Sequence, residues 1–351
     1  MHSVLSFCPK NRYAPAIKEK NRDIGSTMAE WTVSSISALY HRELLGLLFE
    51  AARVHQQHFK PGEIQVNHLV SVKTGGCPED CSYCPQAARY NTGIKKHGLM
   101  SREEVRTRAE EAKEMGASRV CLGAAWREVK DNDQFDRVID MVKDIKSLGM
   151  ETCCTLGLLT QAQADRLKEA GLHAYNHNLD TSPEHYGKII STRQFEDRIR
   201  TLTHVKNADL QVCCGGILGL GETEEDRIQF LFALTQLEGP PESIPINTLY
   251  AVPGTPLENQ APISIWELVR MIATTRIIFP TAMIRMSAGR EKRSLEDQTL
   301  CFLAGANSLF IGEKLLTIAN PLPEADHHMF THLGLTPKAP FSGSRHADAP
   351  H

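Results

Sequence analysis

Short apolar runs alternate with amphipathic stretches along most of the chain, starting near residue 66. Runs of this length, bounded by turn residues, are typical of strands that are buried on both faces. We predict a strand for each of them. The predicted strands are Val66–Lys73, Ser118–Leu122, Glu151–Leu156, His173–Asn178, Leu210–Gly215, Ser243–Tyr250, Ala282–Ser287 and Asn307–Ile311.

The amphipathic stretches between these runs predict helices. Ser101 and Glu104 have the spacing of a capping box, and Gly116 marks the end of that helix. Thr160 and Gln163 repeat the pattern at the start of a later helix. The other predicted helices are Phe135–Leu148, Phe195–Asn207, Glu224–Leu237, Ser264–Phe279 and Leu295–Ala304, with an extra helix, Arg42–His58, ahead of the first strand.

The alternation of strands and helices predicts an α/β fold with a parallel sheet. Eight such units fit a closed (β/α)8 TIM-type barrel, with Arg42–His58 as an N-terminal helical extension. An open doubly wound sheet is the alternative, but it usually carries G-x-G-x-x-G after its first strand, where this chain has a cysteine loop. We expect a poorly patterned extension at residues 1–37, the barrel at 38–320 and a partly disordered tail at 321–351.

The composition narrows the possible classes of function. The chain has 351 residues, of which 41% are hydrophobic and 23% charged, as is usual for a globular protein. The net charge of -3 gives no basic footprint for nucleic acid, and no apolar stretch is long enough to span a membrane. Ten cysteines without an export signal indicate a reducing compartment, so we expect a cytoplasmic protein.

Three cysteines, Cys77, Cys81 and Cys84, share one short loop with C-x3-C-x2-C spacing, directly after the first predicted strand. A four-iron cluster usually takes four cysteine thiolates, so three would leave one iron open to a small molecule. A structural zinc site is the alternative, but it needs a fourth ligand, and no second cysteine pair lies nearby. Gly75 and Gly76 would allow the backbone to approach closely just before the loop.

Strand parity predicts a second cysteine set. Successive side chains of a strand point to opposite faces, and we expect the more polar set of each strand to face the barrel interior. This rule places four side chains, each from a different strand, inside one lumen: Cys121, Cys153, Cys213 and Arg285. Cys154 and Cys214 should face outward. Three inward cysteines with an arginine favour a second metal site, and inert buried cysteines are the alternative.

Two further segments are candidates for ligand binding. Asn176, Asn178 and Asp180 alternate on one face of a predicted strand end, where amides and a carboxylate could grip a polar ring or ribose hydroxyls. The glycine-rich segment Gly215–Glu222 would let backbone lie against a ligand. The alternative for the first segment is a polar strand end without a ligand. The alternative for the second is that its glycines serve only the geometry of a turn.

The cysteine spacing, with Tyr83 before the last cysteine, resembles the signature of radical S-adenosylmethionine (SAM) enzymes. Gly215-x-Ile217-x-Gly219-x-x-Glu222 is similar to the G-x-I-x-G-x-x-E segment that lies beside SAM in that superfamily. Longer stretches resemble the biotin synthase family, over roughly residues 38–335. They are Thr74–Cys81, Gly123–Trp126, Tyr175–Pro183, Pro245–Asn247 and Ser287–Glu291.

The resemblance implies roles for individual residues. It assigns a [4Fe–4S] cluster to Cys77, Cys81 and Cys84, and a [2Fe–2S] cluster to Cys121, Cys153, Cys213 and Arg285. The doubled cysteines at 153–154 and 213–214 leave some ambiguity in this choice. The implied SAM contacts are Tyr83, Asn178, Asp180, Gly215, Gly216, Ile217, Gly219 and Glu222. The implied substrate contacts are Asn176, Asn178 and Asn247.

The resemblance also implies an activity. The family's enzymes are sulfurtransferases that insert sulfur into dethiobiotin to form biotin, the last step of biotin biosynthesis. SAM would be cleaved to a 5′-deoxyadenosyl radical, with electrons from a flavodoxin- or ferredoxin-type protein. Iron–sulfur assembly proteins and a homodimer are further expectations, with no nucleic acid or membrane partner. The alternatives are another radical SAM mutase or lyase, and a non-catalytic iron–sulfur carrier.

Overall fold

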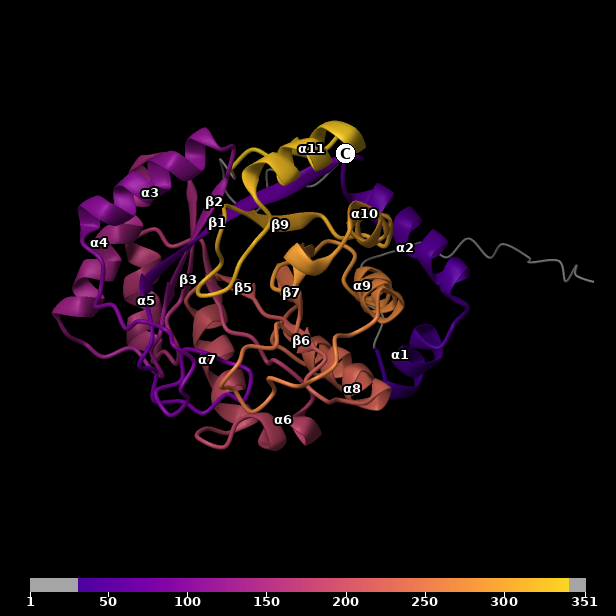
Figure 1. The fold of residues 1–351 in the computed structure, drawn as a ribbon, viewed down its shortest axis with the longest axis horizontal. Coiled ribbons are helices and arrows are strands. Elements are labelled where there is room, and N and C mark those ends of the chain that lie inside the picture. Colours follow the sequence, from indigo (N-terminus) through magenta and orange to yellow (C-terminus); the bar gives the residue numbers. More distant parts are fainter. Residues whose placement is uncertain (1–30, 341–351) are drawn as a thin grey trace, which may run out of the picture. The chain divides into compact units, whose positions relative to one another are not determined.

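A closed barrel of parallel strands forms the centre of the structure (Figure 1), a computed structural model that describes residues 31–340. Each strand pairs with the next along the chain, and the last pairs with the first. This closure excludes the open doubly wound sheet and confirms the predicted barrel. The barrel strands are β1 (Glu63–Lys73), β2 (Arg119–Ala124), β3 (Glu151–Thr155), β4 (Ala174–Asn176), β5 (Gln211–Cys213), β7 (Ser243–Thr248), β8 (Met283–Met286) and β9 (Ser308–Ile311).

The fifth strand is interrupted. After β5 the chain resumes as β6 (Gly216–Leu218), which pairs with β7 rather than with β4. The break falls at Gly215, where an added Cβ would lie 1.9 Å from the Pro245 carbonyl oxygen. The close approach therefore requires glycine, and it moves the chain after β5 toward the barrel mouth.

Helices surround the barrel, as Figure 1 shows. They are α1 (Val33–Tyr40), α2 (Leu44–His58), α3 (Arg102–Glu114), α4 (Asp133–Ser147), α5 (Gln161–Glu169), α6 (Pro183–Ile189), α7 (Phe195–Asn207), α8 (Glu224–Thr235), α9 (Ile265–Ile278), α10 (Leu295–Leu303) and α11 (Pro323–Leu333). The predicted capping box of α3 is formed, because the Ser101 hydroxyl accepts from the Glu104 amide and the Glu104 carboxylate accepts from the Ser101 amide. None of the described helices is both long enough and apolar enough to cross a bilayer.

The N-terminal helices add a second layer outside the ring. Helix α2 packs along α9 and buries Leu47 and Ala51, and α1 packs against α8. Arg270 of α9 donates to the backbone oxygens of Tyr40 and Arg42, at 2.5 and 2.8 Å, and so holds the turn between α1 and α2. Helix α1 starts within the segment 1–37 that was predicted to be poorly patterned.

Part of the predicted tail is folded against the barrel. Residues from 321 onward include α11 and the short strand β10 (Thr336–Pro337), which pairs with the start of β1. Asp326 of α11 is buried and forms an ion pair with Arg290, with a shortest N–O distance of 2.6 Å. The buried Met329 and the partly buried Phe330 and Leu333 pack against the core and hold this helix together with the ion pair. Residues 341–351 lie outside the described part.

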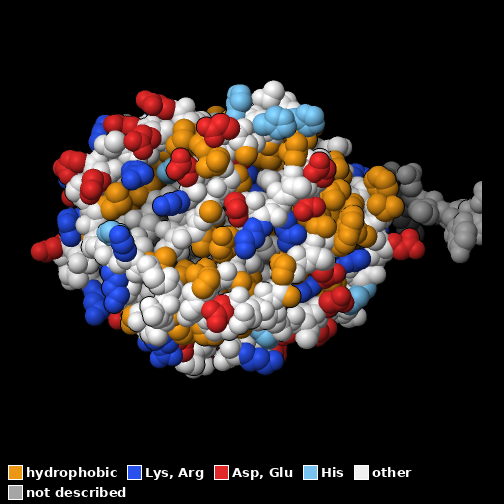
Figure 2. Space-filling view, viewed as in Figure 1, with side chains coloured by type: hydrophobic (Ala, Val, Ile, Leu, Met, Phe, Trp, Pro, Cys, Tyr) orange, Lys and Arg blue, Asp and Glu red, His pale blue; other side chains and the backbone are white. Residues whose placement is uncertain are grey.

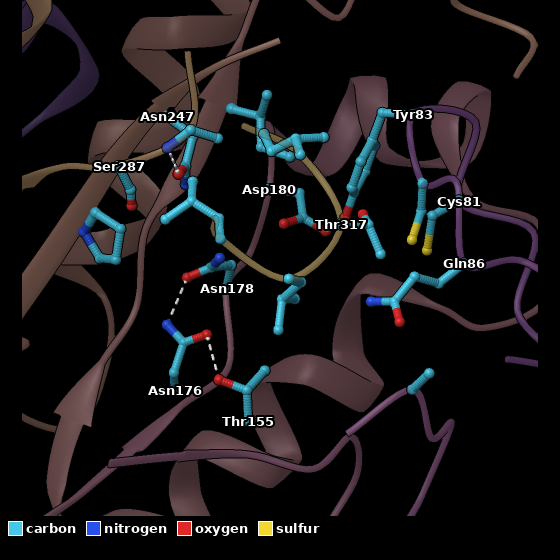
Figure 3. Close-up of a pocket in the computed structure, with 18 of the residues that line it drawn as sticks. Cys81, Tyr83, Gln86, Thr155, Asn176, Asn178, Asp180, Asn247, Ser287 and Thr317 are labelled. Carbon is cyan, nitrogen blue, oxygen red and sulfur yellow. Dashed lines mark hydrogen bonds between the residues drawn. The ribbon is translucent and has the colours of Figure 1, made fainter. Parts of the chain in front are cut away.

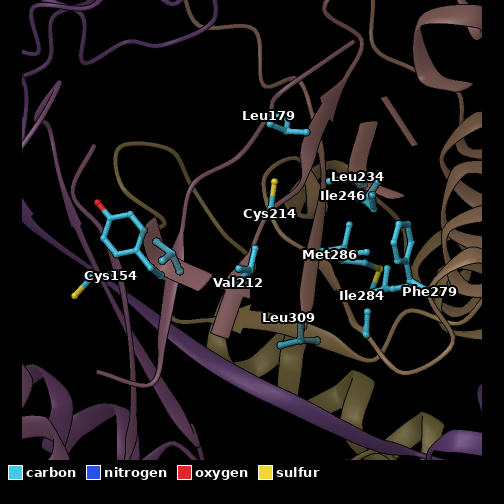
Figure 4. Packing of buried hydrophobic residues seen from close by; sticks show 14 of the residues in the cluster. Cys154, Leu179, Val212, Cys214, Leu234, Ile246, Phe279, Ile284, Met286 and Leu309 are labelled. Atoms are coloured by element: carbon cyan, nitrogen blue, oxygen red, sulfur yellow. The ribbon is translucent and has the colours of Figure 1, made fainter. Parts of the chain in front are cut away.

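The outward side chains of the strands form one apolar layer against the helices (Figure 4). Cys154 and Cys214 both lie in this layer and are fully buried, as strand parity predicts. Cys121, Cys153 and Cys213 belong to a separate cluster inside the lumen. The parity rule therefore separates the two members of each cysteine pair correctly.

An apolar patch lies on the surface of the N-terminal and C-terminal helices (Figure 2). Figure 2 shows apolar side chains gathered over the region where Figure 1 places α2, α9 and α10. The exposed large residues of these helices are Leu45, Phe49, Trp266 and Leu303. Exposed apolar patches of this kind are typical of protein–protein interfaces.

Arg276 closes the base of the barrel. Its guanidinium is fully buried and donates to the carbonyl oxygens of Gly305, Pro280 and Ala282, at 2.8 to 3.1 Å, and to the side chain of Asn307 at 3.1 Å. These acceptors belong to the segments that lead into β8 and β9. One side chain thus joins the end of α9 to two neighbouring strands.

We expect Arg276→Met to lower the free energy of unfolding by about 3 kcal/mol or more, because several buried carbonyls lose their donor. Urea-induced unfolding followed by circular dichroism measures the change. Arg106→Met, on the exposed face of α3, is the control and should cost less than about 1 kcal/mol. Equal losses in the two variants would contradict this role for Arg276.

Candidate functional site

A cavity of about 340 Å³ lies at the C-terminal ends of the strands. It is lined from the three-cysteine loop, from the lumen and from the loops that follow the strands (Figure 3). The predicted site residues on its wall are Cys77, Cys81, Tyr83, Cys84, Cys121, Cys153, Asn176, Asn178, Asp180, Ile217, Asn247 and Arg285. Both predicted cysteine sets therefore reach this cavity, although Cys213 of the lumen set does not line it.

The three-cysteine loop begins with a turn that only glycine adopts easily. Gly75 and Gly76 both have left-handed backbone angles, with φ of +73° and +74°. The Lys73 ammonium holds the turn by donating to the Gly75 and Ala125 carbonyl oxygens, each at 3.0 Å. The side-chain oxygen of Gln86 accepts from the Gly75 amide at 3.0 Å. The turn thus directs the loop across the end of β1.

Asp80 anchors the same loop to the segment between α6 and α7. Its carboxylate accepts from the backbone amides of Ser191 and Thr192, at 2.9 and 3.2 Å, and from both hydroxyls. Burial alone would raise the pKa of Asp80, but the hydrogen bonds from Ser191 and Thr192 outweigh it and hold the pKa at about 2. The charged carboxylate is therefore the form that fixes the loop.

Cys81 of the loop is buried, and Cys77 and Cys84 are half-buried. Burial raises the pKa of Cys81 to about 11 and that of Cys84 to about 12. Burial also raises the pKa of Cys77. Without a bound cation these side chains stay protonated near neutral pH, so metal binding would have to release their protons.

The second cysteine set lies deeper in the lumen, on β2, β3 and β5. Cys121 pairs in register with Cys153, and Cys213 pairs with Asn176 one strand further on. All three cysteines are at least 97% buried. Hydrogen bonding to Cys153 lowers the pKa of Cys213, as do the Arg285 charge and a hydrogen bond from Asn176. These contacts therefore favour a thiolate at Cys213.

Arg285 is fully enclosed beside these cysteines. Its Nη1 reaches the Cys213 sulfur at 3.6 Å. Its remaining donors are used by Ser308, Gln65 and Asn67, at 3.0 to 3.2 Å. The guanidinium is thereby fixed in the plane that faces Cys213.

A row of amides connects the two cysteine sets. Asn176 accepts from Thr155 at 3.1 Å and donates to Asn178 at 2.9 Å, as the dashed lines in Figure 3 show. Asn247, across the cavity, donates to the Gly216 carbonyl at 3.1 Å and accepts from the Ala288 amide at 3.1 Å. These contacts fix the amide planes that a polar ligand would meet.

Asp180 links the loop to the amide row. It has a left-handed φ of 69°, which is uncommon for aspartate, and its carboxylate accepts from the Tyr83 hydroxyl at 2.7 Å. Arg198 forms a buried ion pair with the same carboxylate and donates to the Asn178 carbonyl at 2.5 Å. Tyr83 and Asp180 therefore position each other across the cavity wall.

The glycine-rich segment shapes the wall from behind. Of its predicted contact residues, Ile217 reaches the cavity, whereas Gly215, Gly216, Gly219 and Glu222 do not line it. The Glu222 carboxylate accepts from the Gly219 amide at 2.9 Å and from Arg227 at 2.9 Å. Glu222 thus braces the turn that presents Ile217.

Several cavity residues were missed by the sequence reasoning. Arg193 comes from the loop after α6, and Ser287 follows β8. Thr317 lies at the tip of a small hairpin after β9, closed by the bridge between Lys314 and Ala319. Arg193 and Thr317 belong to no periodic segment, so hydrophobic patterning carries no signal for them, whereas Ser287 ends the predicted strand Ala282–Ser287 on the same face as Arg285.

The donor set fits a cluster better than a single ion. Within residues 31–340, no three His, Cys, Asp or Glu side chains gather closely enough to hold one metal ion. This disfavours the zinc alternative for the described residues, because zinc needs four ligands around a single atom. An iron–sulfur cluster takes one cysteine per iron and so spaces its ligands around a larger volume.

A closed barrel with an open three-cysteine loop at its mouth defines a radical SAM protein, and the Radical SAM superfamily model matches residues 71–234. The chain belongs to the biotin synthase family. The biotin synthase of Cytophaga hutchinsonii is 57% identical over 320 residues, covering 91% of this chain and 94% of that protein. The Myxococcus xanthus biotin synthase and the Arabidopsis thaliana mitochondrial biotin synthase are each 54% identical, covering 89% of this chain and 90% and 82% of theirs.

A second family model also matches the chain, and two solved structures show the same fold. The Biotin and Thiamin Synthesis associated domain model matches residues 245–336. Methylornithine synthase has the same fold, with a TM-score of 0.74 at 21% identity, covering 90% of this chain and 95% of that one. The hydrogenase maturase HydG also has this fold, with a TM-score of 0.74 at 16% identity. The match covers 87% of this chain and 72% of that one. Family membership implies an iron–sulfur cluster and SAM.

We expect Asp80→Asn to loosen the three-cysteine loop, because charge-assisted hydrogen bonds to Ser191 and Thr192 are weakened by about 2 kcal/mol. Iron bound per chain at limiting iron and sulfide should fall. Asp165→Asn, on the exposed face of α5, is the control. Equal iron uptake in both variants would show that Asp80 does not anchor the loop.

Proposed function

We propose that this chain is a sulfurtransferase that converts dethiobiotin into biotin. The observation that carries the proposal is one cavity lined by members of two different cysteine sets, which a row of fixed amides joins. An enzyme that makes a radical at one place and takes sulfur from another needs both sets within reach of one substrate.

The proposal assigns a cluster to each set. Cys77, Cys81 and Cys84 would hold a [4Fe–4S] cluster with one open iron, and Cys121, Cys153, Cys213 and Arg285 a [2Fe–2S] cluster. When bound, the first supplies the electron that cleaves SAM to a 5′-deoxyadenosyl radical, and the second supplies sulfide. Dethiobiotin C–H bonds carry no acidic proton, so acid–base groups alone could not open them.

The chain's own residues bind, orient and exclude water. The fixed amides of Asn176, Asn178 and Asn247 offer donors and acceptors to a polar ring such as the ureido group of dethiobiotin. Leu69 and Ile217 form apolar wall beside them, where they would keep water from a reactive radical. Tyr83 and Asp180 hold the loop and the amide row in one arrangement.

The alternatives account for less of the structure. A non-catalytic iron–sulfur carrier has no need of a cavity lined by oriented amides. Another radical SAM mutase or lyase would use the three-cysteine loop, but it would leave the lumen set with its enclosed Arg285 without a role. We further expect a flavodoxin- or ferredoxin-type reductant, iron–sulfur assembly proteins, and a homodimer that covers part of the apolar patch on α2, α9 and α10.

An anaerobic single-turnover assay with dethiobiotin and SAM tests the reaction. The reconstituted chain should form 5′-deoxyadenosine and biotin, Cys81→Ala should form neither, and Cys153→Ala should cleave SAM without forming biotin. Cys154→Ala is the matched control, since its sulfur lies outside the lumen, and it should keep both products. Absence of both products from the cluster-loaded chain would refute the proposal.

Iron and sulfide counting tests the ligand assignment separately. With four-iron and two-iron clusters, the loaded chain should hold about six irons, Cys153→Ala about four and Cys81→Ala about two. Cys154→Ala should match the unaltered chain. Equal iron in Cys153→Ala and Cys154→Ala would contradict a cluster on the lumen set.

A further inference from the structure

Arg193 is a buried cavity arginine that the proposed mechanism does not use. It lies between α6 and α7, its side chain is 8% exposed, and it lines the cavity. Within residues 31–340, its Nε has no hydrogen-bond partner. Its Nη2 lies 3.9 Å from the Cys81 sulfur. The other arginine nearby, Arg198, is instead committed to Asp180, Tyr186 and the Asn178 carbonyl.

The acidic residues around Arg193 do not fully neutralise its positive charge. Its nearest acid is Glu79, with 3.9 Å between Nε and Oε2. Glu79 is itself shared, because it pairs with Arg127 at 3.4 Å and accepts from the Thr192 hydroxyl. Two guanidiniums therefore face one buried carboxylate. Arg127 is 40% exposed and screened by water, which leaves Arg193 as the enclosed positive charge beside Cys81.

Other charged groups near the loop are already paired. Asp80 pairs with Arg89, Asp180 pairs with Arg198, and Lys73 donates to two backbone oxygens. Lys73 and Arg198 also act by charge on Cys77 and Cys81, and Arg285 lies beside the lumen set instead. Arg193 adds to these charges a direct contact with a sulfur of the three-cysteine loop.

We propose that Arg193 sets the reduction potential of the cluster on Cys77, Cys81 and Cys84, an inference that rests on the proposed function. Reduction adds one electron, supplied by a low-potential flavin or iron–sulfur protein, and makes the site more negative by one charge. A buried cation near a ligand sulfur stabilises the reduced form more than the oxidised form. Hydrogen bonds and charge at cluster sulfurs are known levers on such potentials. Arg193 is thus a positioning and tuning residue, not a ligand.

A redox titration separates this role from a structural one. The EPR signal of the reduced loop cluster, identified by its loss in Cys81→Ala, is followed against solution potential without SAM. We expect Arg193→Met to lower the ratio of reduced to oxidised cluster about tenfold at fixed potential, equivalent to about 59 mV. Arg193→Lys, which keeps the charge, should recover most of the shift. Arg200→Met, on the exposed face of α7, should have none.

The outcomes distinguish this inference from the proposed function. A chain that assembles no cluster sensitive to Cys81→Ala would refute the proposed function. A cluster that assembles normally, with the same potential in Arg193→Met as in the unaltered chain, would overturn the role of Arg193 alone. If Arg193→Met loads no iron, Arg193→Gln replaces it: a potential below that of Arg193→Lys supports the inference, and an equal potential overturns it.

Discussion

Thiols that must become thiolates where water is excluded impose the main physical constraint on this molecule. Burial raises the pKa of Cys81 to about 11 and that of Cys84 to about 12, so the protein environment opposes the charged form that a metal ligand requires. Enclosed cations near the cysteine sulfurs offset this effect. Arg193 stands beside the loop set, and Arg285 stands beside the lumen set. Each guanidinium lies close enough to a cysteine sulfur to stabilise a negative charge on that sulfur.

Barrel closure makes this arrangement possible. Because every strand runs in the same direction, all the strand ends meet at one mouth, where a loop after β1 can face residues from β4 and β7. The lumen beneath can be polar because its groups bond to one another across strands. Arg285 uses Gln65 and Asn67 of β1, and Arg119 pairs with Glu151 at 2.6 Å. A polar interior with internal partners avoids most of the cost of burying charge.

Regular periodicity is what made much of the fold predictable. The two-residue repeat of strands separated Cys153 from Cys154 and Cys213 from Cys214, since neighbours must face opposite ways. Local signals also identified the glycine turn before Cys77 and the cap at Ser101. Irregular loops have no such repeat.

Contacts between distant loops were beyond the reach of sequence patterns. The place of Arg193 depends on how the loop after α6 packs on the cysteine loop, through contacts more than a hundred residues apart in sequence. The same limit applies to α11, which is held by the pair of Asp326 and Arg290. The resemblance to known enzymes supplied roles for Glu222 and Gly219, but the three-dimensional contacts place these residues behind the wall.

Asp180 shows how the cavity acts as one unit. A non-glycine residue with φ of 69° is held in an uncommon conformation, which persists when surrounding contacts determine it. Here the Asp180 amide donates to the Gly215 carbonyl at 3.2 Å, and its carbonyl accepts from the Ile217 amide at 2.8 Å. Its carboxylate meanwhile holds Tyr83 on the cysteine loop. The break after β5, the apolar wall at Ile217 and the cysteine loop are therefore mechanically coupled through one backbone position. Loop contacts, together with the barrel strands, therefore determine how the cysteine loop faces the lumen.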